Sequence, residues 1–452
     1  MMTVKTDVCV IGAGAGGIGC TYRLIKNGVN TVVVDKNPDF GGTMVFGGVD
    51  GWEPGVSLDG IHILLKDELE KKEKGAHAVT GVPNTNVLSS EFDRDWKNHS
   101  FDRLPFWYCM NTAIGYSDTL GRCKTMSKNG KCRFQFEPDL MREAIHTVLS
   151  PYLANLTELF EYSYKSCTVE EGKIKSITVT KNGEDAEIVA DFFVDASGDI
   201  VLARDAGCQY AFGSDGPEDY NEPSAIAKSD SVNGVTYLFR ISRSPDPDYV
   251  DEIPAEYKIA DIEKWVGTRM RTVLSYCAQY PNGDISVNML PTLEGKEYFD
   301  LGDSADLIGK ARVYAYWNYL QTEKGMKGWY IEKIFDAGIR ESYRLKGKYV
   351  LREQDLREGM LKQPKIGRTV AIADHALDVH GEGALAKELE IPYEIPVECA
   401  MTNEYENLFV ACRGASFSHI AAASARLTRT MLSMGEGVGE YIAEQIKNVV
   451  PH

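Results

Sequence analysis

The chain has 452 residues, 43% of them hydrophobic and 25% charged, which is the composition of a globular protein with a sizeable core. A chain of this length is expected to divide into two closely packed lobes. Its formal net charge of -17, with no compensating cluster of lysine and arginine, argues against nucleic acid as a partner because the phosphate backbone is also negative.

The apolar runs are short and interrupted, so we expect no membrane partner. The opening residues, MMTVKTDVCVIGAGAGG, lack the features of a secretory signal. The ten cysteines contain no CxxC pair, which argues against a zinc or dithiol site and is typical of reduced thiols. Together these observations predict a cytoplasmic protein without a metal site, and they leave its oligomeric state open.

A strand–helix–strand unit is expected at the start of the chain. Residues 7–11 form an apolar run that predicts a buried strand, and residues 18–28 have the apolar spacing of a helix that ends at a glycine. Residues 31–34 predict a second buried strand, which Asp35 follows.

The glycine cluster GAGAGG at 12–17 suggests what this unit binds. Gly12, Gly14 and Gly17 fill a G-x-G-x-x-G motif. The first glycine allows a tight turn, the second allows close approach of a pyrophosphate, and the third lets the helix pack on the strand. Asp35 is placed to accept hydrogen bonds from a ribose. The unit therefore predicts a dinucleotide-binding site, and by itself it does not distinguish NAD from FAD.

The chain is irregular from 45 to about 130, apart from a helix expected at 61–75. Another helix begins near Glu137 and leads into alternating strands, with the turn signal Asn182-Gly183 between two of them. A buried strand is expected at 191–196.

Residues 215–390 are richer in charge, aromatic residues and turns, and the last sixty residues return to a strand and a long helix. We therefore predict an α/β fold in which a Rossmann-like lobe with a parallel sheet and a β-meander carries an inserted α+β substrate lobe. The first lobe would comprise residues 1–45, 131–214 and 391–452, and the second residues 46–130 and 215–390.

Two later stretches favour FAD. NPDFGGT at 37–43 places a glycine pair after the acidic residue, and VDASGD at 194–199 ends a later strand. On these motifs the chain resembles the two-lobed FAD-dependent oxidoreductases of the glutathione-reductase-like superfamily. The resemblance implies FAD as the cofactor. The residues that it places next to FAD are Gly41, Gly42 and Thr43 in the turn, and Asp195, Gly198 and Asp199 at the strand end.

The resemblance covers most of the chain and extends to FAD-dependent oxidoreductases that open with a GGT turn and WEPG. The matching stretches are GWEPGVSLDGIH (51–62), GIRESYRLKGKYVL (338–351), ALDVHGEG (376–383) and IPVECAMTNEYENLFVACR (395–413). It implies that Arg413 and Ser416 lie at the cofactor and that the small residues of 411–426 lie under the flavin ring. Cys412 departs from the usual glycine before Arg413, and Glu436 departs from a common glutamine near the flavin.

Two features of other members of the superfamily are missing from the sequence. No C-x4-C follows the glycine pair, so we expect no dithiol chemistry. No second strand–GxGxxG–helix unit is present, and the glycines at 435–439 fall within a predicted helix, where close helix packing explains them. Electrons are therefore expected to pass directly between a substrate and the flavin, while docking of NAD(P)H without its own domain stays open.

Flavin chemistry on an alcohol or amine needs a group that moves a proton and a group that anchors the substrate. His419 and His380 are the candidate acid or base, with a structural role equally open for each. Arg340 and Arg426 are the candidate anchors, because an arginine fork binds carboxylate in a bidentate way. A salt bridge is the alternative for an arginine, and for Arg344 we prefer it.

The residues at the WEPG turn and two aromatic runs offer further candidates for a pocket wall. Trp52 and Glu53 lie beside the WEPG turn, whereas the runs at 106–109 and 313–320 are more typical of a core.

The sequence thus predicts an FAD-dependent oxidoreductase, and in particular a dehydrogenase that passes hydride between a small polar substrate and flavin N5. Its electron acceptor or donor is unknown. One alternative is a flavin-dependent reductase of an activated C=C bond with an arginine as proton donor. The other is a binding protein that keeps the fold without activity, against which the intact glycine motif and Asp35 argue.

Overall fold

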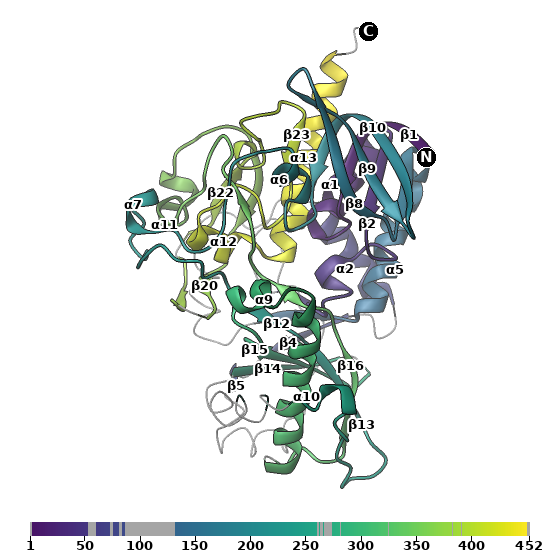
Figure 1. Ribbon diagram of the computed structural model, residues 1–452, viewed down its shortest axis with the longest axis vertical. Coiled ribbons are helices and arrows are strands. Elements are labelled where there is room, and N and C mark those ends of the chain that lie inside the picture. Colours follow the sequence, from purple (N-terminus) through teal and green to yellow (C-terminus); the bar gives the residue numbers. More distant parts are fainter. Residues whose placement is uncertain are drawn as a thin grey trace.

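The computed structural model describes residues 2–52, 60–72, 76–80, 84–85, 132–259, 262, 265, 274–280, 282–323, 325–381, 383–389 and 391–449. A seven-stranded sheet in the order β7-β2-β1-β10-β9-β8, with β23 also on β10, occupies the part of the molecule that holds the N-terminus (Figure 1). Its strands are β1 (Met2–Ile11), β2 (Thr31–Asp35), β7 (Leu156–Phe160), β8 (Ser163–Glu170), β9 (Lys173–Lys181), β10 (Glu184–Asp195) and β23 (Leu408–Val410).

The sheet has a parallel part and an antiparallel part. Strands β7, β2, β1, β10 and β23 run parallel to one another, and the apolar runs of β1, β2, β10 and β23 are buried because helices cover this part of the sheet. Strands β8, β9 and the first half of β10 form the antiparallel meander. Asn182 and Gly183 take φ values of 53° and 83° in the turn between β9 and β10, so the expected hairpin is confirmed.

Four helices pack around this sheet: α1 (Ala15–Lys26), α2 (Ile61–Lys71), α5 (Pro138–Leu149) and α13 (Thr428–Val449). Helices α1 and α13 approach closely through glycines. A Cβ on Gly435 of α13 would lie 1.9 Å from the carbonyl oxygen of Gly16, so no larger residue fits there. The glycines at 435–439 therefore serve helix packing, as predicted.

A second sheet, antiparallel, has the order β16-β13-β15-β14-β5 and lies at the other end of the molecule (Figure 1). Its strands are β5 (Asn84–Thr85), β13 (Phe239–Arg243), β14 (Leu274–Gln279), β15 (Ile285–Leu290) and β16 (Trp329–Ile334). Helix α10 (Ala305–Glu323) packs on it with Tyr316 and Trp317 fully buried. The aromatic run at 313–320 is therefore core, as expected.

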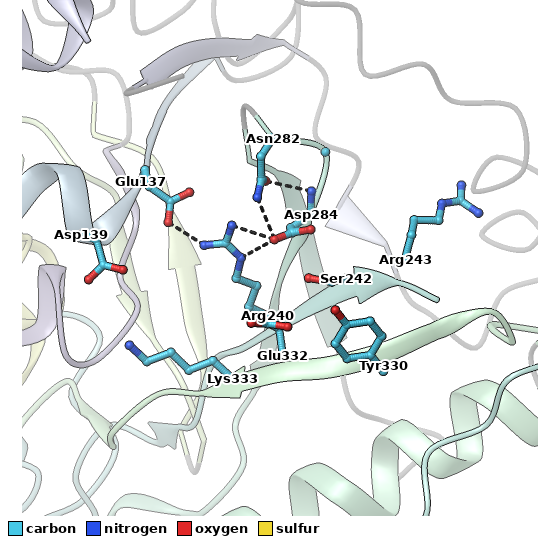
Figure 2. Close-up of a pocket in the computed structure, with 11 residues that line it drawn as sticks. Glu137, Asp139, Arg240, Ser242, Arg243, Asn282, Asp284, Tyr330, Glu332 and Lys333 are labelled. Atoms are coloured by element: carbon cyan, nitrogen blue, oxygen red, sulfur yellow. Dashed lines mark hydrogen bonds and ion pairs between the residues drawn. The ribbon is translucent and has the colours of Figure 1, made fainter. Parts of the chain in front are cut away.

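Arg240 links the segment before α5, beside the first sheet, to the segment before β15 in the second sheet. Its guanidinium donates to Glu137, just before α5, at 2.5 Å and to Asp284, just before β15, at 2.7 Å (Figure 2). These contacts lie in a surface cavity of about 850 Å³ in which the arginine's charge is already matched by two carboxylates. The charge of Arg240 is consequently neutralised within this cavity, and its contacts there are structural.

The remaining elements are short and lie outside these two sheets. The short strands are β3 (Gly51–Trp52), β4 (Ala76–Thr80), β6 (Cys132–Phe136), β11 (Tyr210–Ala211), β12 (Val235–Thr236), β17 (Gly338–Ile339), β18 (Arg344–Leu345), β19 (Thr369–Ala373), β20 (Leu377–Val379), β21 (Leu385–Lys387) and β22 (Tyr393–Pro396). The short helices are η1 (Gly42–Met44), η2 (Ser150–Asn155), α6 (Val201–Asp205), α7 (Pro217–Tyr220), η3 (Ala255–Tyr257), α9 (Gly295–Leu301), η4 (Gly302–Ser304), α11 (Glu353–Lys362), η5 (Val397–Cys399) and α12 (His419–Ala425). The pairs β12–β17 and β20–β21 matter most here, because the residues next to them reach the candidate site.

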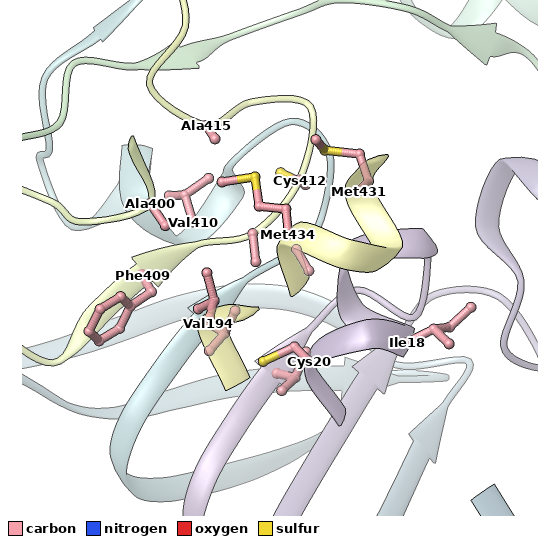
Figure 3. Packing of buried hydrophobic residues seen from close by; sticks show 14 of the residues in the cluster. Ile18, Cys20, Val194, Ala400, Phe409, Val410, Cys412, Ala415, Met431 and Met434 are labelled. Atoms are coloured by element: carbon pink, nitrogen blue, oxygen red, sulfur yellow. The ribbon is translucent and has the colours of Figure 1, made fainter. Parts of the chain in front are cut away.

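Two hydrophobic clusters form the core. In the larger one, Cys20 of α1, Val194 of β10, Val410 of β23 and Met434 of α13 gather in one layer (Figure 3). The smaller cluster belongs to the second sheet and α10. Buried side chains from 345–389 also join the larger cluster, and the division into lobes at the boundaries given above stays a prediction.

The arrangement confirms the predicted α/β fold with a parallel sheet and a β-meander. In the part of the chain that the structure describes, no helix combines the length and the apolar character that crossing a membrane requires. Glu53 and the aromatic run at 106–109 lie outside the described residues.

Candidate active site

A cavity of about 760 Å³ opens where β1, β2 and β10 end and continues to the residues that follow β17, β20 and β23. The carboxyl edge of a parallel sheet is the usual place for a ligand in such folds. Its lining changes along its length, from glycines and backbone at the sheet to arginines and histidines beyond it.

Of the predicted glycines, Gly12 and Gly17 allow close packing at the turn, and Gly14 lines the cavity. Gly12 has a φ of +105°, and a Cβ there would lie 2.3 Å from the carbonyl oxygen of Ala196. A Cβ on Gly17 would lie 1.7 Å from the carbonyl oxygen of Gly12, so this glycine lets α1 pack on the turn. Gly14 lines the cavity, and the nearest atom to a Cβ there is the Cα of Gly42, 3.8 Å away. A side chain on Gly14 would thus take up ligand space.

The second glycine pair closes the turn from the other side. Gly42 packs against Gly14, since a Cβ on it would lie 2.6 Å from the Cα of Gly14. Gly42 and Thr43 line the cavity, whereas Gly41 supports the turn by donating its N–H to the carbonyl oxygen of Ala13 at 3.0 Å.

Asp35 lines the cavity at the end of β2. Its carboxylate accepts hydrogen bonds from the N–H groups of Ala13 at 2.6 Å and Asn37 at 2.7 Å. Burial raises the pKa of Asp35 above its ordinary value, and these backbone donors oppose that effect. Tyr162 and Ser163, which the sequence reasoning missed, line the same end.

The end of β10 supplies one supporting and two facing residues. Asp195 is buried and accepts from the N–H of Ser197 at 3.1 Å, so it shapes the turn without lining the cavity. Gly198 and Asp199 do line it, and Asp199 accepts from Arg413 Nη2 at 2.7 Å. The ion pair places Arg413 on the cavity wall as well.

These residues fit a dinucleotide such as FAD. Helix α1 has Gly14 as its N-cap, with no side chain capping it and no acidic residue in its first turn, so its N–H groups are left for a phosphate. The Nε atoms of Arg413 and Arg426 are buried without a partner among the described residues. The residues that would hold the cofactor are Gly14, Asp35, Gly42, Thr43, Gly198, Asp199 and Arg413.

Beyond the glycines, the cavity holds a polar cluster made of Arg340, Arg426, His380 and Asp378. His380 Nε2 and Asp378 Oδ2 are 2.7 Å apart, and Arg426 Nη2 lies 3.6 Å from the same oxygen. Arg340 Nη1 donates to the carbonyl oxygen of Gly234 at 2.8 Å.

The cluster shifts the titration of its members. Burial lowers the pKa of His380, and the charge of Arg340 acts in the same direction, while the hydrogen bond with Asp378 opposes both. Burial pushes the pKa of Asp378 upward, yet His380 and Arg426 together hold it well below its usual range. Burial and the charge of Arg426 lower the pKa of Arg340 to about 9. The neutral form of His380 is thus favoured, with the carboxylate of Asp378 beside it.

His419, Ser416 and Glu436 are not among the lining residues of this cavity. His419 Nδ1 lies 2.9 Å from Glu341, which also pairs with the buried Arg344. Ser416 accepts from the N–H of Gly347 at 3.0 Å, and Glu436 accepts from the N–H of Ile61 at 2.8 Å. Of the two candidate histidines, His380 therefore lines the cavity and His419 does not.

The stretch 411–426 contributes three residues to the cavity lining. Cys412, Arg413 and Arg426 line the cavity, but the N-terminus of α12 is turned toward Asp215, which accepts from the N–H of His419 at 2.7 Å. Arg344 forms the salt bridge that we preferred for it, since it pairs with Asp215 at 3.0 Å.

The sequence reasoning missed the pairing of His380 with Asp378, although a signal was present. Asp378 lies in β20 (Leu377–Val379) and His380 directly follows it, so the two are i and i+2 in extended chain, where side chains two apart share a face. Thr236 and Asn288 also line the cavity from the second sheet's side, and no local motif marks either residue.

Comparison with known proteins adds three findings. The family model described as FAD dependent oxidoreductase matches residues 7–452. The 3-oxosteroid 1-dehydrogenase of Mycolicibacterium smegmatis is 32% identical over 118 residues, which is 25% of this chain and 20% of that protein. The glutamate synthase [NADPH] small chain of Halomonas elongata is 52% identical over 40 residues, 9% of this chain and 8% of that protein. The chain thus matches about one fifth or less of the length of these curated relatives.

Among solved structures, a geranylgeranyl bacteriochlorophyll reductase-like protein from Thermoplasma acidophilum has a TM-score of 0.45 at 13% identity, over 99% of this chain and 80% of the other. The L-proline dehydrogenase from P. horikoshii has a TM-score of 0.40 at 14% identity, over 100% of this chain and 95% of the other.

Proposed function

This chain belongs to the FAD-dependent oxidoreductase family, with FAD as its cofactor, and on that premise we propose that it is a dehydrogenase acting on a small polar substrate. One observation carries the proposal. A single cavity is lined at one end by the dinucleotide-binding glycines and at the other by a cluster of two arginines, a histidine and a carboxylate. Two of the matched relatives are called 3-oxosteroid 1-dehydrogenase, which supports the dehydrogenase assignment.

Oxidation of an alcohol or amine removes a hydride from carbon and a proton from oxygen or nitrogen, and bound FAD supplies the hydride acceptor. The chain must then supply the proton acceptor and hold the substrate. His380 suits the first task, because its lowered pKa keeps it neutral and Asp378 at 2.7 Å fixes the ring. Arg340 and Arg426 suit the second, since both face the same part of the cavity.

The test is anaerobic reduction of the FAD-loaded protein by a panel of alcohols, hydroxy acids and amines, followed by the loss of visible flavin absorbance. We expect one class to bleach the oxidised flavin. His380→Gln should slow that step by about 10²- to 10⁴-fold, the usual contribution of a general base. His146→Gln is the matched control, because His146 also lies 2.7 Å from a carboxylate, Asp39, but outside the cavity lining. No bleaching by any class would overturn the proposal.

A reductase of an activated C=C bond is the second candidate, and the lowered pKa of Arg340 favours it. A guanidinium with a pKa of about 9 releases its proton more readily than an ordinary one. The same panel separates the candidates when unsaturated acids are added to the reduced protein. A reductase would be reoxidised by such an acid, whereas a dehydrogenase would be reduced by its substrate.

We also propose that the protein works in the cytoplasm. The cysteines that support this are free, namely Cys9, Cys20, Cys167, Cys208, Cys399 and Cys412. Burial raises the pKa of the Cys20 thiol, as expected for a core residue. Cell fractionation with a thiol count on the purified protein would test the compartment.

A further inference from the structure

Arg340 is the arginine of the cavity whose charge is not matched. Arg413 pairs with Asp199 at 2.7 Å, and Arg426 lies 3.6 Å from Asp378. Among the described residues, no carboxylate oxygen lies within 4.0 Å of the Arg340 guanidinium, whose partners are the carbonyl oxygen of Gly234 and the hydroxyl of Thr236. A buried cation without a counter-ion is costly, which points to a missing anion.

The hydrogen bonds of Arg340 leave a defined part of its fork available. Nη1 uses its two N–H groups on Gly234 and Thr236, at 2.8 Å and 2.7 Å. Nε–H and the two N–H groups of Nη2 remain, and Nε–H is parallel to one of those on Nη2. That spacing matches the two oxygens of a carboxylate. Gly234 and Thr236 therefore hold the guanidinium through Nη1 and leave its Nε–Nη2 edge for a ligand.

Within the cluster of Arg340, Arg426, His380 and Asp378, the charges point to one anionic group. Arg340 and Arg426 each carry a positive charge, and Asp378 carries a negative one. His380 contributes no charge in its neutral form, which its lowered pKa favours. The cluster consequently has a surplus of one positive charge, which a single carboxylate would neutralise.

We propose that Arg340 binds a carboxylate of the substrate, and that the substrate is a small hydroxy acid or the corresponding oxo acid. The assignment of a hydroxy acid rests on the dehydrogenase function proposed above, while the carboxylate contact does not. A substrate ammonium group would be repelled by the net positive charge of the cluster. A hydroxyl therefore suits the position beside His380 better than an amine. No described residue forms a hydrogen bond with His380 Nδ1, which leaves that atom for the substrate hydroxyl.

Binding can be measured apart from turnover. The FAD-loaded protein is titrated in a calorimeter with lactate and mandelate, and with their uncharged amides, lactamide and mandelamide. We expect at least one acid to bind about 10- to 100-fold more tightly than its amide, the usual contribution of hydrogen bonds to charged groups. Arg340→Gln should remove that preference, and Arg340→Lys should restore part of it, because lysine keeps the charge but not the fork.

Arg368→Gln is the control for the loss of an arginine. Arg368 pairs with Glu444 on the outside of the molecule and does not line the cavity. This variant should bind acids as the unaltered protein does. FAD content and thermal unfolding of each variant show whether it is folded, and Thr236→Val, which removes only the hydroxyl behind Arg340, provides a milder change that should weaken acid binding a few-fold.

The outcomes separate this inference from the proposed function. Equal binding of acids and amides, or an acid preference that survives Arg340→Gln, overturns the carboxylate contact, and so does failure of every acid to bind. Bleaching by uncharged alcohols alone would overturn it and leave the dehydrogenase standing. Acids that bind through Arg340 but only reoxidise reduced flavin would support the contact and overturn the dehydrogenase.

Discussion

Replacement of Asp378 by asparagine tests how the site uses His380. The substitution keeps the shape of the side chain but removes the charge that lies 2.7 Å from His380 Nε2. A hydrogen bond to a charged group contributes about 1.5–3 kcal/mol, so the loss should slow flavin reduction about 10- to 150-fold. Stopped-flow absorbance of the FAD-loaded protein, mixed anaerobically with the substrate found in the panel, measures this rate.

The pH profile gives the sharper readout. A base must be neutral, so the rate falls as pH drops through the pKa of His380, which burial already lowers. Asp378 is the group that raises that pKa, against the charges of Arg340 and Arg426. In Asp378→Asn the pKa should fall further, and the acid limb of the profile should move to lower pH.

A purely structural role for Asp378 would lower the rate and leave the acid limb in place. A limb that stays still, or that moves to higher pH, would refute the reasoning. Asp39→Asn is the control, since it breaks the equally short contact with His146 outside the cavity lining and should change neither the rate nor the limb.

Three further predictions concern the cofactor turn and the buried charges. Gly14→Ala should fold but retain FAD poorly, because a Cβ on Gly14 meets no chain atom closer than 3.8 Å. Gly17→Ala should lower the melting temperature, because a Cβ there would lie 1.7 Å from the carbonyl oxygen of Gly12. FAD content and thermal unfolding of the two variants test this difference. Burial alone would raise the pKa of Glu341, but His419 and Arg344 lower it to about 2. The charged form of Glu341 therefore stabilises the folded protein by about 3 kcal/mol. This contribution is present above the ordinary pKa of 4.5 and is lost as pH falls through about 2. Urea unfolding of Glu341→Gln should show lower stability at pH 7 and a smaller loss on acidification. His419→Gln should also destabilise the fold but change the rate of flavin reduction by no more than about tenfold. Complete loss of flavin reduction in a folded variant would instead indicate that His419 takes part in the reaction.

The nucleotide-binding part of the site could be predicted from the sequence because its geometry is local. Gly12 and Gly14 belong to the turn between β1 and α1, Gly17 belongs to the first turn of α1, and the strand and the helix fix what each position must do. Asp35 comes at the end of the next strand, so its distance from the turn follows from the parallel register of β1 and β2. Short-range patterns of this kind carry their own structural context.

The substrate end could be predicted only as a set of candidates. Arg340, His380 and Arg426 come from three separate elements, and no sequence spacing says which of them meet. The choice between His380 and His419 depended on one long-range contact, since Glu341 captures His419 in a buried ion pair. A histidine beside small residues looks the same in the sequence whether it faces a cavity or a carboxylate.

The buried charges outside the cavity still act on the site through Asn233. Its backbone N–H and its side-chain amide both donate to Glu341 Oε2, at 2.9 Å and 2.8 Å, while its side-chain oxygen accepts from the N–H of His380 at 2.9 Å. The next residue, Gly234, donates its N–H to the carbonyl oxygen of His380 at 2.9 Å and accepts from Arg340. The backbone that carries the proposed base and the backbone that holds the proposed anchor are therefore one hydrogen-bonded unit, fixed at its rear by Glu341. Because a hydrogen-bonded unit moves as a whole, a change at Glu341 should disturb the position of His380 and Arg340 together, even though Glu341 does not line the cavity.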